Sequence, residues 1–238
     1  MLTSLRCAKG DIAGNLARHR DLLESALQRR CDLLLLPEMS LTGYRAGAAL
    51  ALEHPAVTGL VAATATGPAL CFGLAESDPA GGHPFITQLV ADHGELTAVH
   101  RKAHLGEGED GDFQPGIPAG MVRLRGTTCA LAVCAEIGTA PPYAYDGVRL
   151  VLGPSAPGLY GDRRRTAADW RRGWDWWRGS VTDDAARLLR GDQVLVVSTQ
   201  AGATDDEDFP GWAAVLEPGG RVADELPDWR EGTLVVEL

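Results

Sequence analysis

The feature that most restricts how this chain can fold is an uninterrupted run of four leucines, Leu33 to Leu36, between Asp32 and Pro37. A half-exposed strand alternates apolar and polar side chains, and this run does not alternate. It therefore predicts a short strand that is buried on both faces and that ends at Pro37. The run is too short to cross a membrane, which takes about 20 apolar residues.

Helix and strand patterns alternate along the rest of the chain. Helices are predicted after the caps at 11–15, over 55–66, and before Gly191 with Thr182 as the N-cap. Strands are predicted at 5–8, 69–75, 122–124, 129–133, 149–152 and 194–198, with a hairpin at 85–100 turning at 92–94 and another turning at 218–220. This mixture predicts an α/β layered architecture with the helices outside, in one domain spanning 1–238.

Composition excludes several classes of protein. Of the 238 residues, 45% are hydrophobic and 23% are charged, which is typical of a globular chain rather than a disordered one. The formal net charge of -10 argues against a nucleic-acid partner, which needs a basic face. The five cysteines lack paired spacing, which favours a reducing, cytoplasmic location over a disulfide framework. Neither CxxC nor HExxH occurs, so no metal site is expected.

Three reactive side chains follow apolar strands, where α/β folds tend to place their sites. Glu38 comes directly after the leucine strand, and burial there would raise its pKa toward that of a general base. Lys102 follows the 85–100 hairpin, and its ammonium could hold an oxyanion or lower the pKa of a thiol. Cys134 directly follows the predicted strand at 129–133, and its thiolate would be a nucleophile.

Each of the three has a simpler interpretation when it is taken alone. Glu38 would be a surface glutamate in a turn, Lys102 a solvated lysine on an edge strand, and Cys134 a buried, inert cysteine. What favours a catalytic site is that all three occur together and in this order.

Short motifs surround these positions in chain order. They are Pro37-Glu38 with Thr42-Gly43-Tyr44, Arg101-Lys102 with His104-Leu105, Phe113 and Pro115-Gly116, Cys134 with Pro154-Ser155, and a final VSTQAG stretch before the Pro-Gly-Gly turn. Together they resemble the nitrilase superfamily of carbon–nitrogen hydrolases over nearly the whole chain. The chain departs from that pattern after the cysteine, where Ala135 replaces the usual aromatic residue and the FPE-like turn is missing.

The resemblance implies an α-β-β-α sandwich and an acyl-enzyme mechanism that needs no metal or organic cofactor. Glu38 would take the thiol proton of Cys134, and the thiolate would attack an amide carbon to give a thioester. Lys102 and the backbone N–H of Ala135 would hold the oxyanion. The substrate would be bound by Ala135 together with Tyr44 and Glu136.

The resemblance also implies a second acid four residues before the motif phenylalanine. Counting back from Phe113 gives Glu109, although Glu107 and Asp110 are close enough to compete. Its role would be to position the substrate or the lysine and to assist proton transfer. The alternative interpretation of this GEGED stretch is a solvated acidic loop.

Four tryptophans fall between Trp170 and Trp177. They could form a pocket wall for a bulky acyl group, or they could pack in the core or at a subunit interface. Together with the resemblance, this cluster predicts a homo-oligomer.

The sequence therefore predicts an amidase acting on a small non-peptide amide, with no nucleic-acid or membrane partner. The alternatives on the same fold are a nitrilase, an N-carbamoyl amidase and an amide-forming acyltransferase. Nitrile hydrolysis often accompanies a tryptophan after the cysteine, and Ala135 stands there in this chain. A catalytically inactive binding protein is the alternative from a different class, since fold does not imply function.

Overall fold

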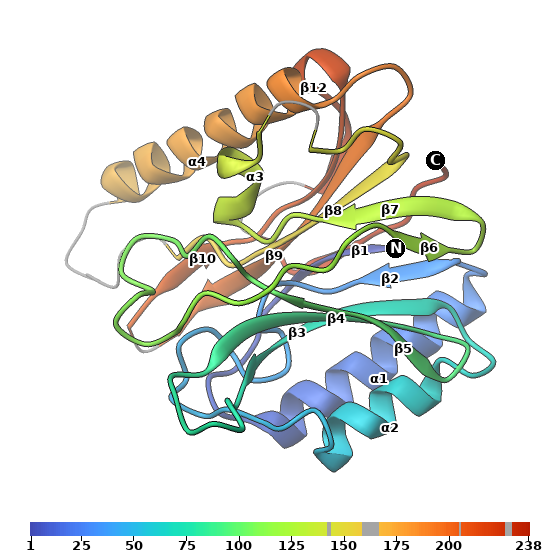
Figure 1. The fold of residues 1–238 in the computed structure, drawn as a ribbon. Coiled ribbons are helices and arrows are strands. Elements are labelled where there is room, and N and C mark those ends of the chain that lie inside the picture. The colour runs from blue at the N-terminus through green and yellow to red at the C-terminus, as the bar shows by residue number, and fades with distance from the viewer. Residues whose placement is uncertain (142–143, 159–166, 205, 227–229) are drawn as a thin grey trace.

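A computed structural model describes residues 1–141, 144–158, 167–204, 206–226 and 230–238. Figure 1 shows helices on the two outer sides of the molecule and the strands between them. The helices are α1 (Ile12–Gln28), α2 (Pro55–Ala63), α3 (Ala135–Thr139) and α4 (Ala167–Leu188), with a 3-10 turn η1 (Pro218–Gly220). No helix in the described part of the chain is both long and apolar enough to span a bilayer.

The strands of the described residues form one continuous hydrogen-bonded sheet, which folds into two sheet layers joined where β1 pairs with β9. In chain order they are β1 (Leu2–Leu5), β2 (Leu33–Leu35), β3 (Ala69–Glu76), β4 (Phe85–Asp92), β5 (Glu95–Arg101), β6 (Val122–Leu124), β7 (Thr127–Leu131), β8 (Leu150–Ser155), β9 (Val194–Ala203), β10 (Asp208–Pro210), β11 (Ala213–Glu217), β12 (Arg221–Leu226) and β13 (Gly232–Leu234). Neighbouring strands follow the order β5-β4-β3-β2-β1-β9-β8-β7-β6, with β10 and β11 on β9, β12 on β11 and β13 on β1. Six neighbouring strands of this order run parallel to one another, namely β3, β2, β1, β9, β8 and β7.

Alternate side chains of one strand enter different cores, and this produces the α-β-β-α layers. Leu34 and Leu36 pack with residues of α1 and α2, whereas Leu35 lies in the core between the two sheets. On the other side, Leu195 packs with residues of α4 and Val196 faces the inner core. The leucine strand is thus buried on both faces, as its lack of alternation predicts, and each fully buried leucine contributes about 2 kcal/mol.

Most of the predicted elements are confirmed, and two local predictions are wrong. The first strand is Leu2–Leu5 rather than 5–8, because Leu2 pairs with β2 and Ser4 with β9. Thr182 is not an N-cap. It lies inside α4, where its hydroxyl donates to the carbonyl of Gly179 at 2.7 Å, and threonine inside a helix often satisfies its hydroxyl in this way.

The tryptophans of α4 take part in core packing. Trp174 is fully buried and stacks on Trp177 with ring centroids 5.4 Å apart, and both rings meet Trp212, directly before β11, edge-to-face. Of the roles predicted for the tryptophan cluster, Trp174 and Trp177 therefore take core packing and do not form a pocket wall. Trp176 is 68% exposed, and the side chain of Trp170 lies outside the described residues.

Candidate active site

Strand direction places the three predicted catalytic residues at one edge of the sandwich. β2 and β7 belong to the parallel set, so Glu38 and Cys134, which follow them, lie beyond the same ends. β5 is separated from β3 by the antiparallel strand β4, and it therefore runs in the direction of β3 again. Lys102, directly after β5, consequently reaches the same edge.

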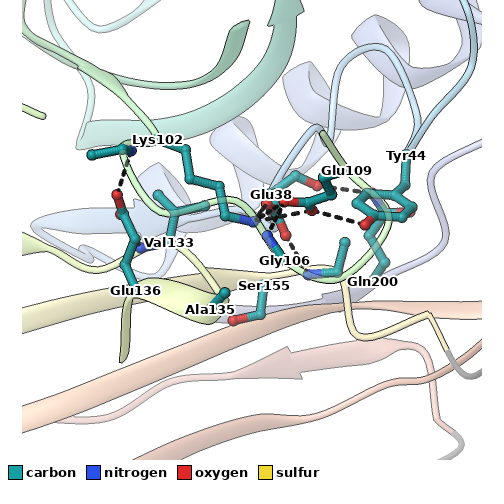
Figure 2. A network of polar contacts seen from close by, with 12 residues as sticks. Glu38, Tyr44, Lys102, Gly106, Glu109, Val133, Ala135, Glu136, Ser155 and Gln200 are labelled. Atoms are coloured by element: carbon teal, nitrogen blue, oxygen red, sulfur yellow. Dashed lines mark hydrogen bonds and ion pairs between the residues drawn. The ribbon is translucent and has the colours of Figure 1, made fainter. Parts of the chain in front are cut away.

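Lys102 lies at the centre of a buried polar network (Figure 2). Its Nζ donates to Oε1 of Glu38 at 2.7 Å and to the two carboxylate oxygens of Glu109 at 2.9 and 3.1 Å. Lys102 and Glu38 are fully buried, and Glu109 is 2% exposed. Burial opposes the charge on Lys102, but the two carboxylates outweigh it and raise the pKa of the ammonium, which stays protonated.

Glu109 is the one of the three candidate acids that reaches this network. Besides Lys102, its oxygens accept from the hydroxyl of Tyr44 at 2.8 Å and from the N–H of Gly106 at 2.6 Å. Glu107 and Asp110 are exposed. Because lysine, tyrosine and backbone donors all point at the Glu109 carboxylate, it is held as a hydrogen-bond acceptor.

Glu38 has fewer hydrogen-bond partners than Glu109. Its Oε2 accepts from the N–H of Ala156 at 2.9 Å, and its backbone carbonyl accepts from Nε2 of Gln200 at 2.8 Å. Burial raises the pKa of Glu38 to about 7, with Lys102 opposing this effect and Glu109 adding to it. A carboxyl group with this pKa can take up and release a proton near neutral pH.

Cys134 occupies a sharp turn between β7 and α3. Its backbone has φ 50° and ψ -105°, a conformation that costs a non-glycine residue about 1–3 kcal/mol. Its N–H donates to the carbonyl of Pro154 at 3.0 Å, which anchors the turn to the end of β8. The helix starts at Ala135, whose N–H has no partner within the helix because it belongs to the first turn.

The charges of Lys102, Glu38 and Glu109 all act on the pKa of the Cys134 thiol. Burial, together with the charges of Glu38 and Glu109, raises the pKa of Cys134 to about 12, although the charge of Lys102 lowers it. The resting group is therefore a neutral thiol that needs a base. Apolar side chains pack beside it, including Met39, Tyr44, Phe113, Val133 and Phe209.

Glu136 lies apart from the other two glutamates (Figure 2). Its Oε1 accepts from the N–H of Ala103 at 2.7 Å, while Oε2 accepts from the N–H of Val133 at 2.9 Å and contacts Nε2 of His100 at 2.7 Å. Burial opposes the charge, but the hydrogen bonds from His100 and the backbone lower the pKa of Glu136 overall. Glu136 and Tyr44 thus have protein partners, where the sequence predicts substrate contacts.

Sequence reasoning missed two supporting residues. His100 lies in the same stretch as Lys102, and Gln200 lies in the VSTQAG stretch that carries part of the resemblance. Both positions were therefore marked by a motif, but a side chain that holds a backbone group across the fold has no local sequence signal.

A family model for carbon–nitrogen hydrolases matches residues 3–238. The chain belongs to this family. The family predicted from the motifs around Glu38, Lys102 and Cys134 is thereby confirmed.

Curated relatives of this hydrolase include two enzymes that match most or all of the chain. A glutamine-dependent NAD(+) synthetase from Rhodobacter capsulatus is 28% identical over 250 residues, which is 100% of this chain and 43% of that protein. An (R)-stereoselective amidase from Pseudomonas sp. is 28% identical over 234 residues, covering 93% of this chain and 78% of that protein. The chain thus spans less than half the length of the NAD(+) synthetase.

Solved structures share the fold of this carbon–nitrogen hydrolase. The amidase from Nesterenkonia sp. AN1, in a structure with acrylamide added at its active-site cysteine, matches with a TM-score of 0.77 and 26% identity over 100% of this chain and 91% of that chain. XC1258 from Xanthomonas campestris, which carries an arsenic adduct in its active site, matches with a TM-score of 0.79 and 20% identity over 97% and 86%. These matches confirm the predicted α/β sandwich of the nitrilase superfamily.

Proposed function

We propose that the protein is a thiol-dependent amidase that hydrolyses a small non-peptide amide through a cysteine thioester. The observation that carries this proposal is the buried network in which Lys102 joins Glu38 and Glu109 beside the thiol of Cys134. The amidases among the related proteins support an amide as the substrate class.

Glu38 rather than Glu109 is the general base in this mechanism. Its pKa of about 7 leaves a substantial fraction ionised near neutral pH and still allows it to hold a proton. Glu109 is occupied by donors from Lys102, Tyr44 and Gly106, so its role is to hold the ammonium in place. The two glutamates thus have separate tasks.

The first half of the reaction forms the thioester. Glu38 accepts the thiol proton as Sγ of Cys134 attacks the amide carbon. The oxyanion accepts hydrogen bonds from Lys102, whose ammonium turns one of its three N–H groups from the Glu109 carboxylate toward the substrate, and from the N–H of Ala135. Glu38 then donates its proton to the leaving nitrogen, and ammonia or an amine departs.

The second half consumes water. Glu38 takes a proton from a water molecule, whose oxygen attacks the thioester carbon. The same two donors hold the second oxyanion. When the C–S bond breaks, the sulfur recovers its proton from Glu38 and the carboxylic acid leaves. None of these steps requires a metal or an organic cofactor.

Mass spectrometry of the intact protein tests the proposal. After brief exposure to a panel of small amides, carbamoyl compounds and nitriles, an amide should leave an acyl adduct that maps to Cys134, with ammonia released in parallel. The Cys134→Ala variant is the control and should carry no adduct. An adduct formed from nitriles alone would favour the nitrilase alternative and contradict an amidase, and turnover without any adduct at Cys134 would contradict the thioester route.

Replacing Glu109 tests the assignment of the second acid. We expect Glu109→Gln to lower kcat/KM by about 10²-fold, because the ammonium loses a charged partner and a small displacement of a catalytic group has this effect. The exposed neighbours offer matched controls, and Glu107→Gln and Asp110→Asn should keep kcat/KM within about twofold. Steady-state kinetics of the three variants decides the matter. An equal loss in all three would assign the effect to loop charge instead.

We also infer a homo-oligomer in a reducing, cytoplasmic compartment, with a small molecule as the substrate. The exposed Trp176 on α4 and the five free cysteines support these two inferences. Size-exclusion chromatography with light scattering should give a multiple of the 25.2 kDa chain mass. A mass near 25.2 kDa itself would reject the oligomer.

A further inference from the structure

The segments that carry Lys102 and Cys134 come from opposite ends of the strand order. β5 lies at one end, paired with β4, and β6 with its partner β7 lies at the other. In the described ladders, β5 shares no pairing with β6 or β7. We call the boundary between β4–β5 and β6–β7 the seam. Something other than a strand ladder must hold Lys102 and Cys134 at a constant separation across it.

Glu136 makes that connection. One carboxylate oxygen accepts from the N–H of Ala103, the residue after Lys102, and the other accepts from the N–H of Val133, the residue before Cys134. Both bonds are short, at 2.7 and 2.9 Å, and Glu136 is 7% exposed. A single carboxylate thus bridges the two catalytic segments through their backbones.

His100 completes the bridge and fixes its orientation. Its Nδ1 accepts from the N–H of Ala119 at 3.2 Å, and a backbone N–H can only donate. The ring proton of a neutral His100 therefore lies on Nε2, which donates to Glu136 at 2.7 Å. With two backbone donors and one imidazole donor, the carboxylate has little freedom to turn toward a substrate.

We propose that Glu136 is a positioning residue whose carboxylate sets the separation of Lys102 and Cys134 across the seam, instead of binding substrate. This inference rests on the proposed function for its kinetic readout. The alkylation rate of Cys134 does not depend on turnover, so it tests the bridge separately.

The matched control is a second carboxylate on the same seam. Asp92, at the end of β4 away from the site, accepts from Nε and Nη2 of Arg125 in the β6–β7 turn at 3.1 and 2.8 Å. Asp92 is 7% exposed, as is Glu136. Asp92→Asn therefore disturbs the same seam without touching either catalytic segment.

The test compares Glu136→Gln with Asp92→Asn. An amide side chain places an NH₂ group against one of the two backbone N–H donors, so one link must break. We expect Glu136→Gln to lower kcat by about 10²-fold with KM nearly unchanged, and to slow alkylation of Cys134 by iodoacetamide, followed by peptide mass spectrometry, about tenfold. Asp92→Asn should stay within about twofold in both readouts.

Each other outcome is decisive. If Glu136→Gln raises KM alone, Glu136 contacts substrate and the inference is wrong; unchanged kcat and alkylation would also overturn it. If Glu136→Gln slows alkylation but the wild-type protein turns over no amide, the result would support the bridge and contradict the proposed function. If Glu136→Gln does not fold, His100→Gln, which keeps a donor toward Glu136, should alkylate faster than His100→Leu, and equal rates in that pair would overturn the inference.

Discussion

Replacing Cys134 by alanine should abolish turnover while the protein stays folded. The thiol supplies the nucleophile in the proposed mechanism, and loss of a nucleophile lowers kcat by about 10⁴-fold or more. The substitution removes one sulfur atom from a half-buried side chain. The hydrogen bond that anchors the turn, from the N–H of residue 134 to the carbonyl of Pro154, is made by the backbone and is kept. We therefore expect the free energy of unfolding to change by less than about 1 kcal/mol.

The matched control for this variant is Cys31→Ala. Cys31 is also half-buried, but it precedes β2 and so lies at the edge of the sandwich opposite the site. Its replacement should leave kcat/KM within about twofold. Amide turnover and urea denaturation of both variants check the pair. A Cys134→Ala protein that kept full activity would remove the nucleophile assignment.

Replacing Lys102 by methionine should damage both catalysis and stability. Loss of one oxyanion donor lowers kcat by about 10²–10³-fold, and the thiol of Cys134 also loses the charge that lowers its pKa. In addition, the variant leaves the carboxylates of Glu38 and Glu109 buried side by side without a cation. Removing one partner of a buried ion pair costs about 3–5 kcal/mol.

The stability loss in Lys102→Met should depend on pH. Without the ammonium, burial and the nearby carboxylate of Glu109 raise the pKa of Glu38 further above its value in the unfolded chain. The folded state then binds more protons than the unfolded state, so stability is highest in acid and falls as pH rises from about 5 to about 8. The wild type shares this trend, because the pKa of Glu38 is about 7, but the variant lacks the opposing charge of Lys102 and its stability should fall more steeply.

Lys9 provides a control with the same three charges at the surface. Its Nζ lies 2.7 Å from Asp206 and 2.7 Å from Glu207, and its side chain is 18% exposed. Because this group is partly solvated, with the Asp206 side chain 63% exposed, Lys9→Met should cost about 1 kcal/mol, well below the loss for Lys102→Met. Urea denaturation at about pH 5 and about pH 8 compares the two variants. Equal losses for Lys9→Met and Lys102→Met, with no pH dependence, would show that Lys102 does not hold the two carboxylates.

The local elements could be read from the sequence because their signals are local. The leucine strand depends on a run of apolar side chains without alternation, and the hairpins that turn at His93 and at Gly219 depend on residues that accept positive φ. All three appear where predicted. The start of α4 was not predictable from the sequence, because the packing of Trp174 against the sheet outweighs the capping signal at Thr182.

The chain order of Glu38, Lys102 and Cys134, each at the end of an apolar strand, is what the sequence alone determined, together with the family that this order indicates. Tertiary structure selected Glu109 over Glu107 and Asp110 as the acid beside the lysine, and it alone showed that Glu136 bridges the two catalytic segments. The physical reason is range. Burial pattern and turn chemistry act over a few residues, whereas a carboxylate's partner depends on where two sheets close, and no local pattern encodes that distance.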